Sequence, residues 1–207
     1  MIFNEFRYRL SPLHHAIIQG NSTACKILLN CGGNSEKGQE PIDVQKCSPL
    51  HYCAMYNKEE LLVQLLQNGS NKYALNIDKR TVLHEACLSG SLKIVKHLLQ
   101  SDSENDIKII DDTRENMRDN VTTADYVNMK DDEGDTPLMM AIESGSKEIV
   151  KILLELKADP CIPNEAQAYP MHIAAKEGAV DIMKLLIKAS DYDPQIFITV
   201  IIEIFIF

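Results

Sequence analysis

Five ten-residue segments of this chain align with one another without gaps, and this internal repeat constrains the fold more than any other feature. Their starts are separated by 37, 33, 55 and 33 residues. The segments are SPLHHAIIQG from Ser11, SPLHYCAMYN from Ser48, TVLHEACLSG from Thr81, TPLMMAIESG from Thr136 and YPMHIAAKEG from Tyr169. A pair of large aliphatic residues follows each start at a fixed distance, namely Leu28/Leu29, Leu65/Leu66, Leu98/Leu99, Leu153/Leu154 and Leu186/Ile187. A register kept through all of them predicts repeated copies of one structural unit.

Each repeated position suits a short helix–turn–helix unit. Ser or Thr at the first position caps a helix, and the following Pro fits the first helical position, where a missing N–H costs nothing. A small residue, usually Ala but Cys53 in the second unit, lies where two helices approach closely. Gly, or Asn57 in the second unit, ends the first helix in a left-handed turn. The second helix is amphipathic, and two helices this short bury their apolar faces only by stacking on neighbouring units.

This pattern resembles the ankyrin family, whose T-P-L-H-x-A signature and 33-residue period it shares over residues 5–190. The resemblance implies an all-α ankyrin-repeat solenoid of five helix–turn–helix units, here called units one to five, each preceded by a loop called a finger. The signature is altered in the later units, where Val82 replaces Pro, Met139 replaces His and Tyr169 replaces Thr.

The end of the second helix also varies between units. Gly32 and Gly69 stand at this position in units one and two, where Gly is usual in the family. The later units carry Asp102, Lys157 and Ser190 instead. We therefore expect the second helices of the last three units to end more loosely.

The step of 55 residues between units three and four exceeds one period by too little for another unit. Residues 102–135 carry twelve acidic and four basic side chains, a net charge of −8. We expect one long acidic inter-repeat loop at residues 105–124, with units one to three over residues 1–104 and units four and five over residues 125–192. A solvated loop is the favoured interpretation, and an acidic arm that binds a basic partner is the alternative.

An apolar tail is expected over residues 193–207, ending in IFITVIIEIFIF. This run is too short to cross a bilayer, which requires about twenty residues. Its β-branched and aromatic residues favour a strand or an aggregation-prone segment. Because solenoids normally end in a polar cap, we expect a truncated chain or alternative end, or a segment that pairs with another element. A tail that folds back over unit five is a further alternative.

The histidines and cysteines give little support to a metal site. Cys47, His51 and Cys53 lie close together in the sequence, but four of the histidines occupy the same repeat position, where local hydrogen bonds within the turn and helix explain them. The Cys and His spacings match no zinc pattern. The acidic run Asp131 to Asp135 lacks the Gly and the terminal Glu of a calcium loop at the required offsets. We expect no metal and no cofactor.

Composition and motifs argue against several other functions. The net charge of −9 argues against nucleic acid as the main partner. No phosphate-binding glycine loop and no nucleophile elbow occurs, so we expect neither an enzyme nor a small-molecule substrate. Six cysteines without disulfide spacing, and an N-terminus without a signal pattern, favour a cytoplasmic protein with free thiols.

A protein partner is the remaining expectation, because a repeat stack presents a long concave surface. The family resemblance implies that contacts come from the fingers and from the two positions after the motif's Ala pair. Those positions are Val44, Gln45, Cys47, Met55 and Tyr56 in unit two; Ile77, Asp78, Arg80, Leu88 and Ser89 in unit three; Asp132, Glu133, Asp135, Glu143 and Ser144 in unit four; and Glu165, Lys176 and Glu177 in unit five. Tyr56 and Met55 are the preferred anchors, since aromatic residues and Met are enriched in interfaces.

A narrower resemblance offers an alternative function. The stretch KADPCIPNEAQAYPMHIAAKEG is similar to a repeat of the transient-receptor-potential ankyrin-type (TRPA) cation channels, on the basis of Pro160, Cys161, Asn164, Pro170 and His172. These channels carry a cytosolic ankyrin stack ahead of their membrane helices. The resemblance implies a regulatory channel segment, which would meet a membrane only as part of a longer chain. None of the family's reactive cysteines is matched in this sequence.

Overall fold

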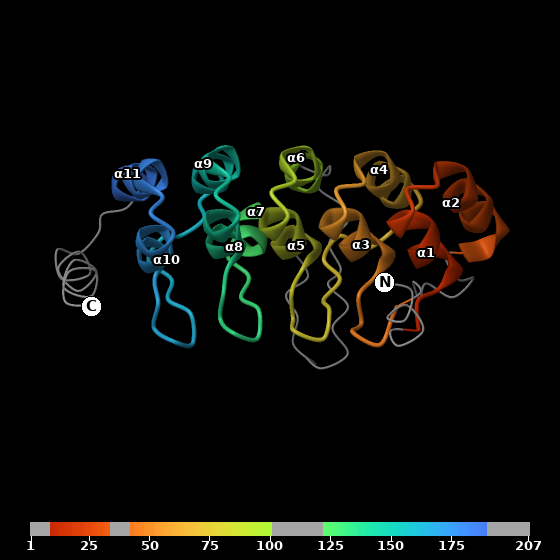
Figure 1. Ribbon diagram of the computed structural model, residues 1–207, viewed down its shortest axis with the longest axis horizontal. Coiled ribbons are helices and arrows are strands. Elements are labelled where there is room, and N and C mark those ends of the chain that lie inside the picture. Colours follow the sequence, from red (N-terminus) through yellow and green to blue (C-terminus); the bar gives the residue numbers. More distant parts are fainter. Residues whose placement is uncertain (1–8, 34–41, 101–121, 190–207) are drawn as a thin grey trace.

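The computed structural model describes residues 9–33, 42–100 and 122–189, which form one row of stacked helix pairs (Figure 1). The predicted all-α solenoid of five units is confirmed. The first helices are α1 (Pro12–Ile18), α3 (Pro49–Met55), α5 (Val82–Leu88), α8 (Pro137–Glu143) and α10 (Pro170–Lys176). The second helices are α2 (Ser22–Leu28), α4 (Glu59–Gln67), α6 (Leu92–Leu99), α9 (Lys147–Glu155) and α11 (Val180–Ala189). In Figure 1 the second helices form the upper row, the first helices the middle row, and the fingers extend below them.

Two further elements interrupt this pattern. A π-helical turn, η1 (Leu29–Gly33), follows α2, and a short helix, α7 (Thr123–Val127), precedes unit four. No helix in the described ranges is long and apolar enough to cross a membrane. The expected acidic loop, up to residue 121, and the whole expected apolar tail lie outside the described residues.

The helix ends follow the local signals of the sequence. The hydroxyls of Ser11 and Thr81 accept hydrogen bonds from the backbone N–H three residues later, at 3.3 and 3.4 Å, and so cap α1 and α5. The residue expected to end each first helix lies in the left-handed region in all five units, with φ between +51° and +68°. These residues are Gly20, Asn57, Gly90, Gly145 and Gly178.

The looser end expected for the second helix of unit four is wrong. Lys157 takes a left-handed φ of +69°, close to the +83° of Gly69 in unit two. The next residue then closes the same turn in both units: the N–H of Ala158 donates to the carbonyl of Leu153 at 2.9 Å, and the equivalent bond in unit two measures 3.1 Å. These bonds offset the strain of a left-handed lysine. Asp102 and Ser190, the corresponding residues of units three and five, lie outside the described residues.

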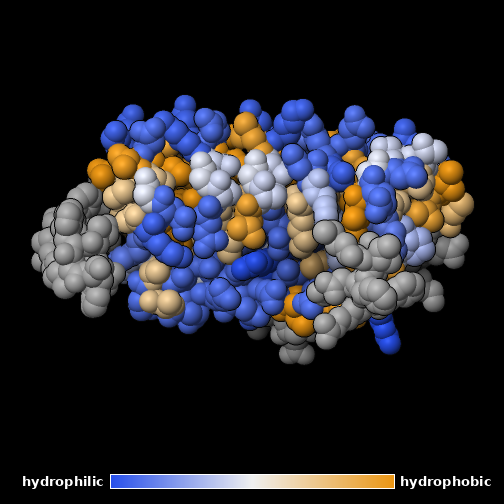
Figure 2. Space-filling model, in the orientation of Figure 1, coloured by the Kyte–Doolittle hydropathy of each residue, from blue (hydrophilic) through white to orange (hydrophobic). Residues whose placement is uncertain are grey.

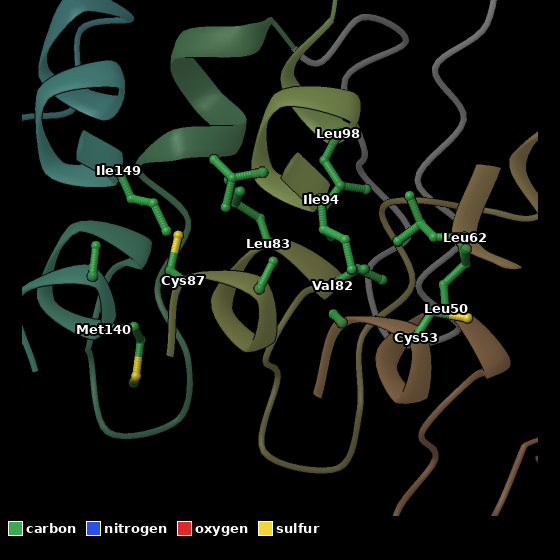
Figure 3. Packing of buried hydrophobic residues seen from close by; sticks show 14 of the residues in the cluster. Leu50, Cys53, Leu62, Val82, Leu83, Cys87, Ile94, Leu98, Met140 and Ile149 are labelled. Atoms are coloured by element: carbon green, nitrogen blue, oxygen red, sulfur yellow. The ribbon is translucent and has the colours of Figure 1, made fainter. Parts of the chain in front are cut away.

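The core is one continuous apolar layer that runs between successive units. Figure 3 shows side chains from three neighbouring units meeting there, among them Leu62, Leu83 and Ile149, all buried. The small residue of each first helix is buried as expected, and Cys53 and Ala86 are fully enclosed. A first helix therefore lies directly against its neighbours, and no unit has a core of its own.

Helix α7 occupies residues where the loop was expected to end. Thr123 and Ala124, both assigned to the loop, are its first residues, and Thr122 caps it by accepting from the N–H of Asp125 at 3.1 Å. Tyr126 is buried beneath unit three, where its ring packs edge-on against Tyr73 at 4.8 Å between centroids. Its hydroxyl also donates to the carbonyl of Lys72 at 2.9 Å. The chain is thus anchored to unit three before it enters unit four.

Candidate functional site

The fingers and first helices form one side of the stack, and each finger is shaped by a single side chain. Asp43, Asn76, Asp131 and Asn164 hold the same place in successive fingers. Their Oδ1 atoms accept backbone N–H bonds from later finger residues at 2.8 to 3.0 Å. This internal network keeps each loop rigid. The sequence signal for this finger network is an Asp or Asn five residues before the repeated motif, a position that lies outside the ten-residue segments.

Neighbouring fingers are joined edge to edge by backbone hydrogen bonds. The bonds run from Ile77 N to Gln45 O at 2.7 Å, from Asp132 N to Asp78 O at 2.8 Å and from Glu165 N to Glu133 O at 2.9 Å. The second of these bonds crosses the 55-residue step, so units three and four stack directly despite the inserted chain. The fingers of units four and five approach so closely that only Gly fits at position 134. A Cβ on Gly134 would lie 2.7 Å from the N of Glu165.

The motif histidines connect each first helix to the finger of the following unit. In His14, His51 and His84, Nδ1 accepts from the backbone N–H of the helix-capping residue at 3.1 Å. The Nε2 atom of each ring then bonds the backbone carbonyl that precedes the next unit's motif, at 3.1 to 3.2 Å. The local hydrogen bond expected from the sequence is confirmed. The second bond, to another unit, was not foreseen.

These histidines are neutral at pH 7. Burial lowers the pKa of His51 and of His84 to about 4, and it also lowers the pKa of His14. One nitrogen accepts and the other donates, which requires the neutral Nε2–H tautomer. Within the described part of the chain, no group of three or more His, Cys, Asp or Glu residues is arranged to hold a metal ion.

Unit four lacks this connection. Met139 occupies the histidine position and is fully buried. The hydroxyl of Thr136, which is 1% exposed, has no hydrogen-bond partner there, whereas Thr81 Oγ1 in unit three lies 2.9 Å from His84 Nδ1. The replacement of His by Met therefore leaves a buried hydroxyl unsatisfied.

The structure brings most of the predicted contact residues to the surface of the fingers and first helices, here called the contact surface. Val44, Gln45, Tyr56, Ile77, Asp78, Leu88, Ser89, Asp132, Glu133, Glu143, Glu165, Lys176 and Glu177 are exposed there. Met55, Arg80 and Ser144 are half-buried, and Cys47 and Asp135 are buried.

Some predicted contact residues are engaged within the protein itself. Arg80 Nε bonds Asp131 Oδ2 at 3.0 Å, which joins the fingers of units three and four. Asp135 accepts from Asn164 Nδ2 at 2.9 Å and so joins the next pair of fingers. Burial raises the pKa of the Cys47 thiol to about 12, which makes the thiol unreactive. The side chains of Arg80 and Asp135 thus hold neighbouring fingers together, and Cys47 is buried.

Tyr56 is held rigidly at the surface of unit two. Its ring stacks on the ring of Tyr52, with 6.2 Å between centroids and 5° between planes. Tyr52 is fixed in turn, because its hydroxyl donates to Asp43 Oδ2 at 2.7 Å and its ring packs edge-on against His14. Tyr56 is 48% exposed, so a large aromatic face is presented to solvent in one fixed orientation.

Comparison with known proteins identifies the repeats. A family model described as "Ankyrin repeats (3 copies)" matches residues 13–111 and 59–197. A "Transient receptor potential cation channel subfamily A member 1 homolog" from Caenorhabditis elegans is 27% identical over 146 residues, which are 70% of this chain and 10% of the relative. The human "Transient receptor potential cation channel subfamily A member 1" is 26% identical over 141 residues, 68% of this chain and 11% of the channel.

A viral protein is similar over most of its own length. The "Putative ankyrin repeat protein FPV223" of fowlpox virus is 27% identical over 145 residues, 70% of this chain and 82% of the relative. By contrast, the chain spans only 10% and 11% of the two channels.

The buried histidines make stability depend on pH. Below the unfolded pKa of about 6.5 the unfolded chain binds protons that the folded chain cannot bind until about pH 4, so stability falls as the pH falls through this range. We expect His84→Met to reduce the loss of unfolding free energy between about pH 7.5 and pH 5 by about 2 kcal/mol, measured by urea denaturation.

The quantity to measure is the difference between wild type and His84→Met in how the unfolding free energy changes with pH. Burial raises the pKa of Glu85 and of Glu143, and this acts in the opposite direction by adding stability as the pH falls. Both carboxylates remain in the variant. An equally steep pH dependence in wild type and in His84→Met would contradict the assigned neutral histidine.

Restoring the histidine in unit four should stabilise the stack. In Met139→His, Nδ1 would bond the Thr136 hydroxyl, and Nε2 would reach the carbonyl of Ala168, which stands where the other histidines find their acceptors. We expect the unfolding free energy to rise by about 1 to 2 kcal/mol. Met139→Leu is the control, since it fills a similar volume without hydrogen bonds, and an equal gain in both variants would refute the explanation.

Proposed function

Because the chain belongs to the ankyrin-repeat family, we propose that it binds a protein partner through the contact surface of units two to five. The observation that carries the proposal is the exposure of large apolar side chains at the contact positions. Val44, Tyr56, Ile77 and Leu88 are each 38% to 48% exposed. Clusters of exposed apolar residues mark interaction sites in folded proteins.

The geometry supports binding because the surface is organised before a partner arrives. Hydrogen bonds fix the finger backbones of units two to five, and Tyr52 fixes the orientation of Tyr56. A rigid surface loses little conformational entropy on binding. Cysteine chemistry fits the cytoplasm, which is part of the proposal: all six cysteines fall within the described ranges and none of them is in a disulfide. We infer binding and not catalysis, with no cofactor and no nucleic acid.

The contact surface can be tested by removing its anchors. We expect the double variant Met55→Ala, Tyr56→Ala to lose the proteins that the wild-type chain captures from its source cells, as measured by pull-down and mass spectrometry. Aromatic anchors commonly contribute several-fold more binding free energy than other contact residues. We therefore expect the amount of captured partner to fall at least about tenfold.

A matched control uses apolar residues that are equally exposed elsewhere. Val180 and Ile187 lie on α11 and are 58% and 43% exposed. The double variant Val180→Ala, Ile187→Ala should capture the same partners as wild type. Circular dichroism should show unchanged helix content in both variants. Equal capture by the two double variants would place binding outside the contact surface.

A second candidate function is a cytosolic regulatory segment of a TRPA-type channel, and the two channel relatives favour it. In that case the native polypeptide that carries these repeats is much larger than 23.3 kDa and fractionates with membranes. An immunoblot of fractionated source cells, together with the reading frame around this sequence, tests it. A native product of about this mass outside the membrane fraction would contradict the channel candidate and leave the binding module standing.

A further inference from the structure

The contact surface changes its chemistry along the stack, and it does so at one boundary. In the row of equivalent finger positions the residue is apolar in units two and three, Val44 and Ile77, and acidic in units four and five, Asp132 and Glu165. The finger hydrogen bonds join these residues into one edge-to-edge row. The surface therefore has an apolar half and an acidic half.

The first helices repeat the same change. Their equivalent position carries Met55 and Leu88 in units two and three, and then Glu143 in unit four. Unit five has Lys176 at this position, beside Glu177 at 3.9 Å. Figure 2 shows hydrophilic side chains gathered over the fingers below α8 and α10. Both rows thus change from apolar to charged at the boundary between units three and four, and the finger row is acidic in both later units.

Two cations of unit three that lie beside the acidic half are already paired with its carboxylates. Lys79 forms an ion pair with Asp132, and Arg80 forms one with Asp131. Glu143 remains without such a partner in the described chain, and burial together with the neighbouring Asp135 raises its pKa. The surface therefore keeps a surplus of carboxylates after its internal pairs are formed.

A buried carboxylate lies at the boundary itself. Glu85 on α5 is only 6% exposed. It faces the fingers, since Arg80, Asp78 and Asp131 are the charged groups that act on it. Burial raises the pKa of this carboxyl, and the Arg80 charge acts in the opposite direction. A cation from outside would interact favourably with the carboxylates of Glu85 and Glu143.

We propose that the partner is an extended polypeptide segment that is apolar at one end and rich in Lys or Arg at the other. This rests on the proposed function. Its apolar end lies over units two and three, and its basic end lies over units four and five. At about 10 Å per unit the two rows extend about 30 Å, the length of about nine extended residues.

Charge argues against two segments of this chain, residues 102–121 and residues 190–207, as occupants. Residues 102–121 are predominantly acidic, and residues 190–207 contain Asp191, Asp193 and Glu203 but no Lys or Arg. A nucleic acid is disfavoured by the same carboxylates. A basic segment of another protein is the occupant that complements both halves.

The test is a selection of random peptides, about twelve residues long, displayed on phage against the whole chain. Binders should be enriched in aromatic or aliphatic residues at one end and in Lys or Arg at the other. Their affinity, measured by fluorescence anisotropy with synthetic peptides, should fall about tenfold on Glu143→Gln with Glu165→Gln and should fall further at higher salt. The control is Glu60→Gln with Glu148→Gln, the same charge change on exposed positions of α4 and α9, which should leave affinity unchanged.

The outcomes separate this proposal from the proposed function. Binders that depend on Tyr56 but show no enrichment in Lys or Arg would overturn the basic partner and leave the binding surface intact. Acidic binders would overturn it equally. Binders that are insensitive to Tyr56→Ala and to both carboxylate substitutions would contradict the contact surface altogether.

Discussion

The stack depends on a side chain that serves two units at once. A motif histidine receives a hydrogen bond from the cap of its own helix and gives one to the finger of the next unit. The pair of bonds sets the distance and angle between successive units, and the finger backbones then join edge to edge. Because burial keeps the imidazole neutral, both bonds persist at pH 7. The contact surface takes its regularity from this arrangement.

Those parts of the fold that are governed by local chemistry could be predicted from the sequence. Caps, prolines and turn residues act within a few positions, so the helix boundaries and the left-handed turns at Gly20 and Asn57 followed directly. The left-handed conformation of Lys157 could not be predicted, because it is stabilised by backbone hydrogen bonds that do not depend on the residue type. Helix α7 was missed for a related reason. Its five residues show no helical period, and Tyr126 is anchored by contacts with Tyr73 and Lys72, more than fifty positions away in sequence.

The repeat register predicts only part of the contact surface. Register identifies equivalent positions, and it therefore placed Val44 and Ile77 correctly at the exposed tips of their fingers. It does not show which way each finger side chain turns. Cys47 and Asp135, one position before the motif, turn inward, and Arg80 in the same position reaches across to Asp131. Glu85 was not a candidate because its neighbours in sequence are ordinary core residues, and only the folded stack places the carboxylate beside the fingers.

The interface between units four and five is the weakest in the stack, so a bound partner would affect its stability. The bond from Met139 to the next finger is missing, while the fingers there are joined by Glu165 N to Glu133 O and by Asn164 Nδ2 to Asp135 Oδ1. Unit five also buries fewer apolar side chains than units two to four, namely Met171, Ala174, Ile182 and Leu186. In a linear stack an end unit with one weak interface is the first to open. A ligand that spans the acidic half would bind only when that joint is closed, so its binding free energy would add directly to the stability of unit five.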